Sequence, residues 1–361
     1  MLNAPRLRNL LILIALLPLG CAESQAADRA SASKAVVREW KPNDYPKDEV
    51  NLIAMGDWGA GYSQQRMVAK TLSQYVAEAG IQFHGLLSPG DNFYPNLRDT
   101  NDRNWVTLFE QMYDPARLNF PFYAVLGNHD YEYSKEFVEL AYAKRYPESR
   151  WRMPARWYRI NMPEERPLVT IIMLDSNKPR LSRADWRAQL RFLGAELAKP
   201  RESKWLVVCA HHPLYTNGSH GDNRTLQLEW GPLLEKYKVD FYIAGHDHDL
   251  QHLQVFNRTV THIVSGGGGK KPRPMRRSDR GPFSRSLNGF VHLRLTEAEA
   301  TARYIDSPGG RTAHLFQRLP DGNVSVLGTT GREVPTTRPT ARPKDFEEID
   351  KDEPTTAPAG R

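Results

Sequence analysis

The chain has 361 residues, of which 40% are hydrophobic and 25% are charged, the balance of an ordinary soluble globular protein. This length accommodates one large domain or two small ones, and the absence of an internal period excludes a repeat architecture. The formal net charge of +7 suits an acidic substrate or an anionic surface, although many exported proteins are basic without a specific partner.

Residues 1–20 have the pattern of a signal peptide. Two arginines precede an apolar run at 10–19, which is too short to cross a membrane as a helix. Two cleavage positions stay open. One lies before Cys21, in a sequence that resembles a bacterial lipobox and would leave a lipid on Cys21, and the other lies among the small residues 24–27. Both predict export to the periplasm or the extracellular space, and the first adds membrane attachment.

The chain has two cysteines, Cys21 and Cys209. The first is removed or lipidated on export, so we expect a mature protein without an internal disulfide. Cys209 lies in the apolar run 205–210, where a buried cysteine acts as a small core hydrophobe. No arginine-containing phosphate loop follows it, which argues against a cysteine phosphatase.

Residues 21–48 are polar and interrupted by proline, which predicts a flexible leader before a domain at 49–330. Short apolar runs within that domain predict strands at 51–55, 84–88, 122–126, 168–174, 205–210 and 241–244. Helical periodicity appears at 64–78, 105–112, 134–145, 183–197 and 226–237. This alternation predicts an α/β fold, or more broadly a layered α+β fold.

After residue 245 the pattern changes to β-type runs with no helical pattern between them. They lie at 253–256, 260–264, 290–295 and 301–305. The change predicts a second sheet packed against the first, so we expect two packed mixed β-sheets flanked by helices. Residues 335–361 are rich in proline, threonine and charge, which predicts a disordered tail.

A basic segment follows the glycines at 266–269. Its cationic residues are Lys270, Lys271, Arg273, Arg276, Arg277, Arg280 and Arg285. Glycines before a lysine also occur in phosphate loops, but the spacing and the following Ser or Thr of a P-loop are absent. We expect a mobile, solvated loop near the mouth of a site, where it attracts anionic substrates.

Five short motifs, each directly after a predicted strand, carry side chains that bind metal ions. They are Gly56-Asp57-Trp58-Gly59, Gly90-Asp91-Asn92-Phe93-Tyr94, Gly127-Asn128-His129-Asp130, Ala210-His211-His212-Pro213 and Gly245-His246-Asp247-His248. Functional groups in open sheets gather at the carboxyl ends of the strands. One such motif carries little information, whereas five in one chain predict a two-metal hydrolytic site.

As a set, these motifs resemble those of the purple acid phosphatases within the calcineurin-like metallophosphoesterases. The resemblance spans residues 52–295 and is closest to the small tartrate-resistant type. Many metallophosphoesterases have a histidine two residues after the first aspartate, where this chain has Gly59. Tyr94, three residues after Asp91, completes the purple acid pattern. The resemblance implies a metallophosphoesterase-like sandwich.

The resemblance also implies two sets of metal ligands. The first ion would be bound by Asp57, Asp91, Tyr94 and His248. The second would be bound by Asp91, Asn128, His211 and His246, with Asp91 bridging both. Carboxylate and phenolate oxygens suit Fe(III), and imidazoles with an amide oxygen suit Fe(II), Zn(II) or Mn(II).

Two further histidines are implied to contact the substrate. His129 would touch the phosphate and help protonate the leaving group. His220 follows His211 by nine residues, a spacing at which the family has a substrate-side histidine. The alternative for His220 is an exposed loop residue, and the alternative to His211 as a ligand is His212.

The sequence therefore predicts an exported acid phosphatase that hydrolyses phosphate monoesters by attack of a metal-bound hydroxide at a binuclear Fe(III)–M(II) centre. Its substrates would be phosphorylated small molecules or phosphoproteins, and we expect no nucleic acid partner. A phosphodiesterase or nucleotidase on the same site is one alternative. A non-catalytic surface binding protein on this fold is another. Asp130 and Asp247 are expected to support ligands rather than to bind metal.

Overall fold

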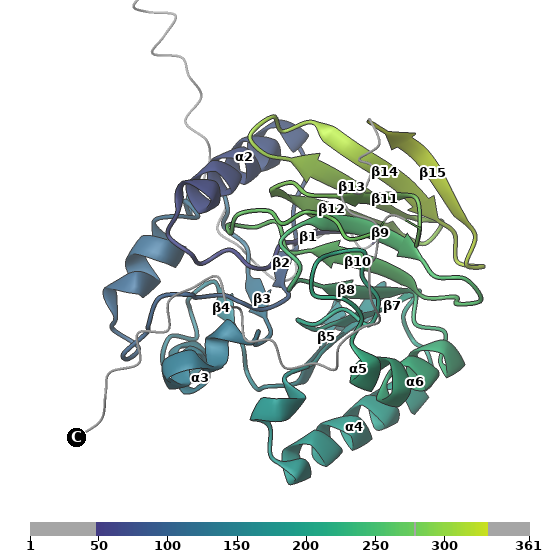
Figure 1. Cartoon of the computed structure of the whole chain (residues 1–361), viewed down its shortest axis with the longest axis horizontal. Coiled ribbons are helices and arrows are strands. Elements are labelled where there is room, and N and C mark those ends of the chain that lie inside the picture. The colour runs from purple at the N-terminus through teal and green to yellow at the C-terminus, as the bar shows by residue number, and fades with distance from the viewer. Residues whose placement is uncertain (1–47, 278, 331–361) are drawn as a thin grey trace, which may run out of the picture. The chain divides into compact units, whose positions relative to one another are not determined.

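The computed structural model describes residues 48–277 and 279–330, which are drawn in colour in Figure 1. The predicted signal peptide, nearly all of the predicted leader and the predicted tail lie outside the described residues. Among the helices of the described part, none has the length and apolarity to cross a membrane.

Two mixed β-sheets form the centre of the fold. The first has the strand order β15-β14-β13-β12-β1-β2-β3-β4. Its strands are β1 (Glu49–Ala54), β2 (Gly85–Ser88), β3 (Phe122–Ala124), β4 (Trp151–Arg152), β12 (Gly289–Thr296), β13 (Ala300–Asp306), β14 (Thr312–Arg318) and β15 (Val324–Thr329). The second has the order β11-β9-β10-β8-β7-β6-β5. Its strands are β5 (Tyr158–Met162), β6 (Val169–Met173), β7 (Trp205–Cys209), β8 (Phe241–Ala244), β9 (Leu250–Gln254), β10 (Thr261–Ser265) and β11 (Phe283–Arg285).

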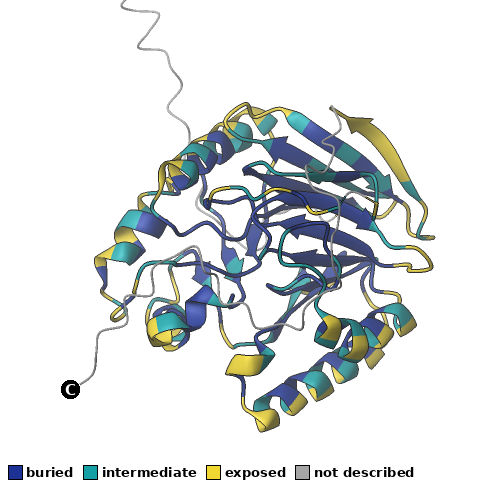
Figure 2. Cartoon of the chain, viewed as in Figure 1, coloured by how far each residue is buried: buried dark blue, intermediate teal, exposed yellow. Residues whose placement is uncertain are grey.

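The strands bury both of their faces, as their near-continuous apolar sequences require. In β1, Leu52 and Ala54 pack in the core between the sheets, whereas Ile53 packs on the opposite face beneath helices. Cys209 lies fully buried in β7, as expected for a core position. Figure 2 shows the central strands as almost uniformly buried and the exposed residues mainly on helices, loops and β15.

Helices cover the outer face of each sheet (Figure 1). The first sheet carries α2 (Ser63–Ala79), α3 (Lys135–Arg145), a π-helical segment (Trp105–Glu110) and a 3-10 segment (His129–Ser134). The second carries α4 (Arg183–Ala198), α5 (Arg224–Glu229) and α6 (Gly231–Lys236), with a 3-10 turn (Lys178–Arg180) before α4. The prediction of two mixed sheets flanked by helices is confirmed.

Local sequence explains where these helices begin and end. The Ser182 side chain accepts a hydrogen bond from the Asp185 N–H at 3.0 Å and caps the start of α4. Gly80 ends α2 with a φ of 63°, a conformation that glycine adopts without steric cost. The prediction of one helix at 226–237 is wrong, because Pro232 lacks the N–H that would join α5 to α6.

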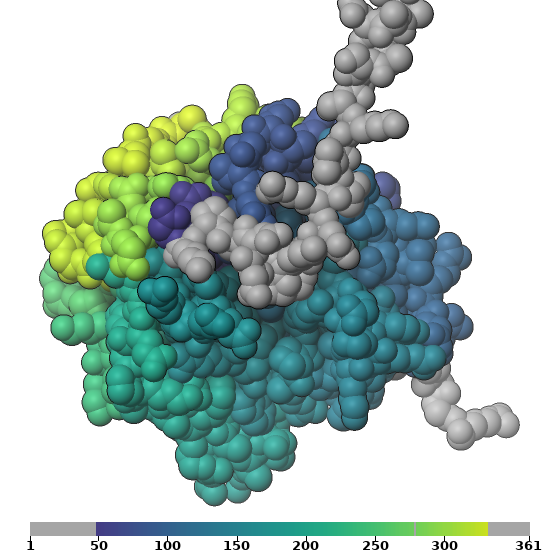
Figure 3. Space-filling view, turned by 180° about the vertical axis from the view of Figure 1, so that it is seen from behind, coloured from purple at the N-terminus to yellow at the C-terminus, as the bar shows by residue number. Residues whose placement is uncertain are grey.

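The prediction that the strands after residue 245 form the second sheet is also wrong. Strands β9 to β11 extend the sheet that contains β8, whereas β12 to β15 extend the sheet that contains β1. The decisive pairing is antiparallel, with Leu52 opposite Leu293 and Glu49 opposite Thr296. Figure 3 shows the purple start of the described chain against yellow-green C-terminal segments, as this pairing requires.

Candidate metal centre

The five motif loops follow β1, β2 and β3 of the first sheet and β7 and β8 of the second. Hydrogen bonds join the loops across the two sheets. The Gly56 N–H donates to Ser265 O at 2.8 Å, and the His246 N–H donates to Asp57 Oδ2 at 3.0 Å. The structure thereby brings together the side chains that the sequence proposes as ligands, namely Asp57, Asp91, Tyr94, Asn128, His211, His246 and His248.

Three of these residues have a backbone conformation that residues other than glycine rarely adopt. The φ angles are 60° at Asp57, 52° at Asp91 and 70° at His246. Each costs about 1–3 kcal/mol, and such strain concentrates at functional sites. A Cβ atom at Gly127 would lie 2.1 Å from Asp91 Oδ1, so glycine is required for this loop to pass beside the carboxylate.

Asp57, Asp91, Tyr94 and His248 form a group that we call the oxygen-rich cluster. The Tyr94 hydroxyl lies 3.5 Å from Asp57 Oδ1, 3.3 Å from Asp91 Oδ2 and 3.3 Å from His248 Nε2. These distances are long for hydrogen bonds. Neighbouring ligands of an octahedral ion, each bound at about 2.0–2.1 Å, lie about 3 Å apart. The four side chains therefore fit around a single cation.

His211, His212 and His246 form a second group, the imidazole cluster, with ring nitrogens within 4.8 Å of one another. The Pro89 carbonyl can only accept, so His211 Nδ1–H donates to it at 2.8 Å and leaves a lone pair on Nε2. That Nε2 lies 2.9 Å from Asn128 Oδ1. Two acceptors repel each other at this distance, and a cation bound to both would remove that repulsion, which fits a second metal ion.

His212 belongs to this cluster but has different hydrogen-bond partners. Its Nδ1 is 2.7 Å from Ser176 Oγ, and its N–H donates to the same hydroxyl at 2.9 Å. Its ring centroid is 4.4 Å from that of His246. Among the two candidates that the sequence left open, His211 is the one whose Nε2 also faces Asn128 and Asp91.

Asp91 lies between the two clusters. Its Oδ2 faces Tyr94 at 3.3 Å, and its Oδ1 lies 3.4 Å from His211 Nε2. The His129 N–H donates to Oδ1 at 2.9 Å. Burial would raise the pKa of Asp91, but the imidazoles of His211 and His129 outweigh it and hold this pKa below its ordinary value.

The electrostatics of the oxygen-rich cluster favour a bound cation. Burial and then the charge of Asp91 raise the pKa of Asp57 well above its ordinary value. Burial and the carboxylates of Asp91 and Asp57 raise the pKa of Tyr94 well above 10. Burial lowers the pKa of His248 to about 3, and the charge of Arg273 adds to that shift. Neutral imidazole is the form that binds metal, and a positive ion would help Asp57 and Tyr94 to ionise.

The two predicted substrate-side histidines border these clusters. His129 Nδ1 lies 3.0 Å from Glu132 Oε1, and its ring centroid is 4.7 Å from that of Tyr94. His220 is half-buried, with its ring centroid 4.0 Å from that of His246. Its Nδ1 lies 2.9 Å from Asp247 Oδ1, so Asp247 orients His220.

Two buried charges fix the loops that carry the ligands. Asp130 accepts hydrogen bonds from the Gly127 N–H at 2.8 Å and the Asn92 N–H at 2.9 Å. It thereby ties the loop after β2 to the loop after β3. The Lys135 ammonium donates to Tyr94 O at 3.0 Å. Sequence reasoning missed Lys135, because it opens a helix and no local motif marks it.

The basic segment differs from the mobile, solvated loop that the sequence predicts. Lys270 is only 7% exposed, and its Nζ lies 4.2 Å from the ring centroid of Tyr94. Arg273 is half-buried and donates to His220 through its guanidinium. These contacts lie far along the chain from the motifs they reach, so no pattern in the sequence indicates them.

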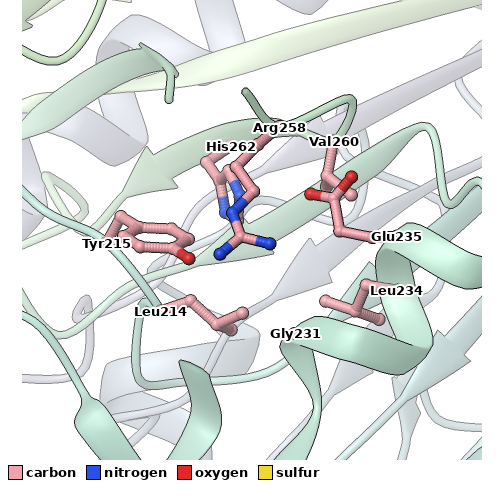
Figure 4. Close-up of a pocket in the computed structure, with 8 residues that line it drawn as sticks. All are labelled: Leu214, Tyr215, Gly231, Leu234, Glu235, Arg258, Val260 and His262. Carbon is pink, nitrogen blue, oxygen red and sulfur yellow. The ribbon is translucent and has the colours of Figure 1, made fainter. Parts of the chain in front are cut away.

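A separate pocket lies under α6, outside both clusters (Figure 4). Its lining is Leu214, Tyr215, Gly231, Leu234, Glu235, Arg258, Val260 and His262. None of these residues belongs to the ligand set, and the pocket has no room for a water molecule. We assign it no function.

Comparison with known proteins agrees with this geometry. A family model described as calcineurin-like phosphoesterase matches residues 50–250. The chain belongs to the calcineurin-like phosphoesterase family. Tartrate-resistant acid phosphatase type 5 of Mus musculus is 31% identical over 297 residues, which cover 73% of this chain and 89% of the mouse protein. Purple acid phosphatase 4 of Arabidopsis thaliana is 29% identical over 324 residues, which cover 82% of this chain and 90% of the plant protein.

Solved structures share the fold of this calcineurin-like phosphoesterase. The purple acid phosphatase PPD1 of yellow lupin superposes with a TM-score of 0.59 and 17% identity, covering 75% of this chain and 54% of that chain. GAP50, described as the anchor in the inner membrane complex of Plasmodium, gives a TM-score of 0.66 and 21% identity, covering 82% of this chain and 100% of that chain. The sequence relatives make this chain a purple acid phosphatase-like metallophosphoesterase, an enzyme acting on phosphoric esters.

Proposed function

We propose that this protein is an exported acid phosphatase that hydrolyses phosphate monoesters at a binuclear centre of Fe(III) and a divalent ion. The observation that carries the proposal is the convergence of ligand atoms at distances, or in pairs of acceptors, that suit bound cations. The Tyr94 hydroxyl faces three potential ligand atoms at 3.3–3.5 Å. The lone pair of His211 faces the Asn128 oxygen at 2.9 Å.

The two ions would have different ligands. Fe(III) would be bound by the oxygen-rich cluster, Asp57, Asp91, Tyr94 and His248, because carboxylate and phenolate oxygens are hard ligands. Fe(II), Zn(II) or Mn(II) would be bound by Asp91, Asn128, His211 and His246. Bound together, the two ions would orient the phosphoryl group and lower the pKa of a water molecule.

The surrounding residues would act on the substrate. His129, beside Tyr94, would hydrogen-bond the phosphate and pass a proton to the leaving oxygen, with Glu132 holding the ring in place. His220, oriented by Asp247, would contact the phosphate from the other side. Lys135 and Asp130 would keep the ligand loops rigid, as a site of this kind requires.

Export is part of the proposal and rests on the charged and apolar start of the chain. Cleavage before Cys21 with lipidation would leave the enzyme attached to a membrane, and cleavage among residues 24–27 would release it. The mass of the N-terminal peptide of the purified mature protein distinguishes these outcomes. An intact residue 1 in that peptide would refute export by this route.

The visible absorption spectrum of the purified protein tests the metal assignment. A phenolate bound to Fe(III) gives a pink to purple colour, so we expect a visible band that Tyr94→Phe abolishes while iron content stays unchanged. Tyr75→Phe is a matched control, because the Tyr75 hydroxyl bonds His292 away from the clusters. A band that survives Tyr94→Phe would refute this ligand. A colourless, active wild-type enzyme would refute the Fe(III) assignment.

Activity measurements on the purified protein distinguish the alternative functions. Faster turnover of a phosphate monoester than of a bis-ester supports the phosphomonoesterase, and the reverse ranking supports the phosphodiesterase. The fold alone also occurs in a protein described as an anchor. A metal-loaded protein without turnover of either ester would therefore favour a non-catalytic binding role.

A further inference from the structure

The segment that follows β10 is held tightly against the motif loops. The Gly268 N–H donates to Gly56 O at 3.0 Å. A Cβ atom at Gly269 would lie 2.2 Å from Trp58 O, and one at Gly266 would lie 2.1 Å from Asp247 O. Side chains larger than glycine would push this segment away. The glycines at 266–269 thus allow the residues that follow them to lie at the edge of the candidate metal centre.

The first part of the basic segment, residues 270–276, is anchored at both ends. The Asn288 side chain donates to Gly267 O at 2.9 Å and to Lys270 O at 2.8 Å. At the other end, Asn217 O accepts from the Arg276 N–H at 2.9 Å. Lys270 and Arg273 therefore occupy defined positions, and their burial differs from that of the exposed Arg276.

Each cation contacts a different residue at the border of the clusters. Lys270 Nζ is 4.2 Å from the ring centroid of Tyr94, at the oxygen-rich cluster. Arg273 donates to Nε2 of His220, whose ring packs on His246 of the imidazole cluster. Both positive charges therefore lie at the border of the clusters, next to the place where the proposed substrate would bind.

The Arg273 guanidinium lies beside His220. Nδ1 of His220 is 2.9 Å from Asp247 Oδ1, and its Nε2 is within hydrogen-bond distance of the Arg273 guanidinium. Arginine stays charged at any working pH. A permanent positive charge is therefore held next to the imidazole cluster, on which the His220 ring packs.

We propose that Lys270 and Arg273 are specificity-determining residues that bind a second phosphate group, linked directly to the phosphate that is cleaved. The preferred substrates would then be diphosphates, either inorganic or organic, rather than simple monoesters. This inference rests on the proposed function, since it places the cleaved phosphate at the two metal clusters. A guanidinium fork and an ammonium are the side chains that bind phosphate oxygens most strongly.

The chemistry explains why cations at this place favour such a substrate. Water oxygen forms a bond to the terminal phosphorus, and the bond from that phosphorus to the bridging oxygen breaks. The electron pair stays on the bridging oxygen, which leaves as part of the second phosphate, and the proton lost by the water passes to solvent or to that phosphate. The leaving group gains negative charge, which Lys270 and Arg273 would stabilise.

Binding of two stable phosphonates tests the inference without turnover. Methylphosphonate mimics a single phosphate, and methylenediphosphonate mimics two linked phosphates. Their affinities would be measured by calorimetry on the metal-loaded full chain, with metal content checked before and after titration. The variants are Arg273→Gln and Lys270→Met, and Arg276→Gln and Lys271→Gln are controls, because these two exposed cations belong to the same segment.

We expect Arg273→Gln and Lys270→Met each to weaken methylenediphosphonate binding about tenfold, the effect of one lost charge-assisted hydrogen bond. Methylphosphonate binding should change less than about threefold, and the controls should change neither. The ratio of kcat/KM for inorganic diphosphate to that for 4-nitrophenyl phosphate should fall in parallel. Thermal unfolding would identify a Lys270 variant that misfolds, in which case Arg273→Gln, at a half-buried position, decides.

Two results would overturn the inference alone. Equal weakening of both phosphonates would mean that Arg273 only positions His220 or binds the cleaved phosphate. Unchanged binding of both would mean that neither cation contacts the ligand. A wild-type protein that holds both ions yet binds neither phosphonate and hydrolyses neither ester would instead refute the proposed function, and the inference with it.

Discussion

The two ligand clusters lie side by side but differ in chemistry, burial and support. The oxygen-rich cluster combines Asp57, Asp91 and His248, all buried, with the phenol of Tyr94. The imidazole cluster has one buried ring, His211, and two that are partly exposed. One side of the centre therefore offers hard anionic ligands away from solvent, and the other offers neutral nitrogens close to it.

The clusters also differ in the source of their side chains. The oxygen-rich cluster draws ligands from the loops after β1, β2 and β8, so an ion there would join both sheets. The three rings of the imidazole cluster come from the loops after β7 and β8 of one sheet, and Asp91 and Asn128 would add ligands from the other sheet. We infer that both ions would contribute to the stability of the sandwich. An ion on the imidazole side, where two rings are partly exposed, would exchange more readily with solvent.

The largest effect should come from the residue that the two clusters share. Asp91→Ala removes the carboxylate whose two oxygens face Tyr94 and His211. We expect both ions to be lost and turnover to fall by more than the roughly 10–100-fold cost of losing an outer partner. Elemental analysis and kcat would be measured together. Retention of both ions at wild-type stoichiometry would contradict the bridging position of Asp91.

A smaller effect should separate the clusters. His211→Ala removes the ring whose Nε2 faces Asn128 at 2.9 Å, so the divalent ion should be lost while Fe(III) and its visible band remain. His212→Ala is the matched control one residue along the chain, since His212 Nδ1 contacts Ser176 instead. We expect it to keep both ions. Loss of the divalent ion from the His212 variant alone would mean that His212, and not His211, binds this ion.

Local sequence predicted much of the fold and of the candidate site. An apolar run followed by glycine and a polar residue is a local signal, so the strands before the five motifs could be placed without the structure. The family resemblance carried by those motifs implies the seven candidate ligands, and the structure brings their side chains together. The positions of Lys270 and Arg273 against Tyr94 and His220 could not be found in this way, because each contact joins segments far apart in the chain.

Other features of the structure depend on contacts between distant segments, which no local sequence pattern indicates. The pairing of β12 with β1 decides which sheet receives the last four strands, and it joins segments at opposite ends of the described chain. The choice between His211 and His212 depends on the Pro89 carbonyl, 122 positions away. The left-handed φ at Asp57, Asp91 and His246 is a cost that only tertiary contacts sustain.

The smallest expected effect is the change in metal affinity between neutral and acidic pH. Burial lowers the pKa of His211 and, more strongly, that of His246. A lowered pKa favours the neutral ring, so protons compete with a metal ion only below the shifted pKa. An imidazole with the ordinary pKa near 6.5 would lose about 25-fold in affinity between pH 7 and pH 5.

We therefore expect the affinity for the divalent ion to fall by less than about tenfold over this range, even though two imidazoles bind it. Competition with a chelator of known pH dependence, at pH 7, 6 and 5, measures that affinity, and the intensity of the visible band reports the Fe(III) side in the same samples. A fall of several hundredfold would mean that these rings titrate as solvated histidines do. The imidazole cluster would then be open to water, and activity in acid would require a different set of ligands for the divalent ion.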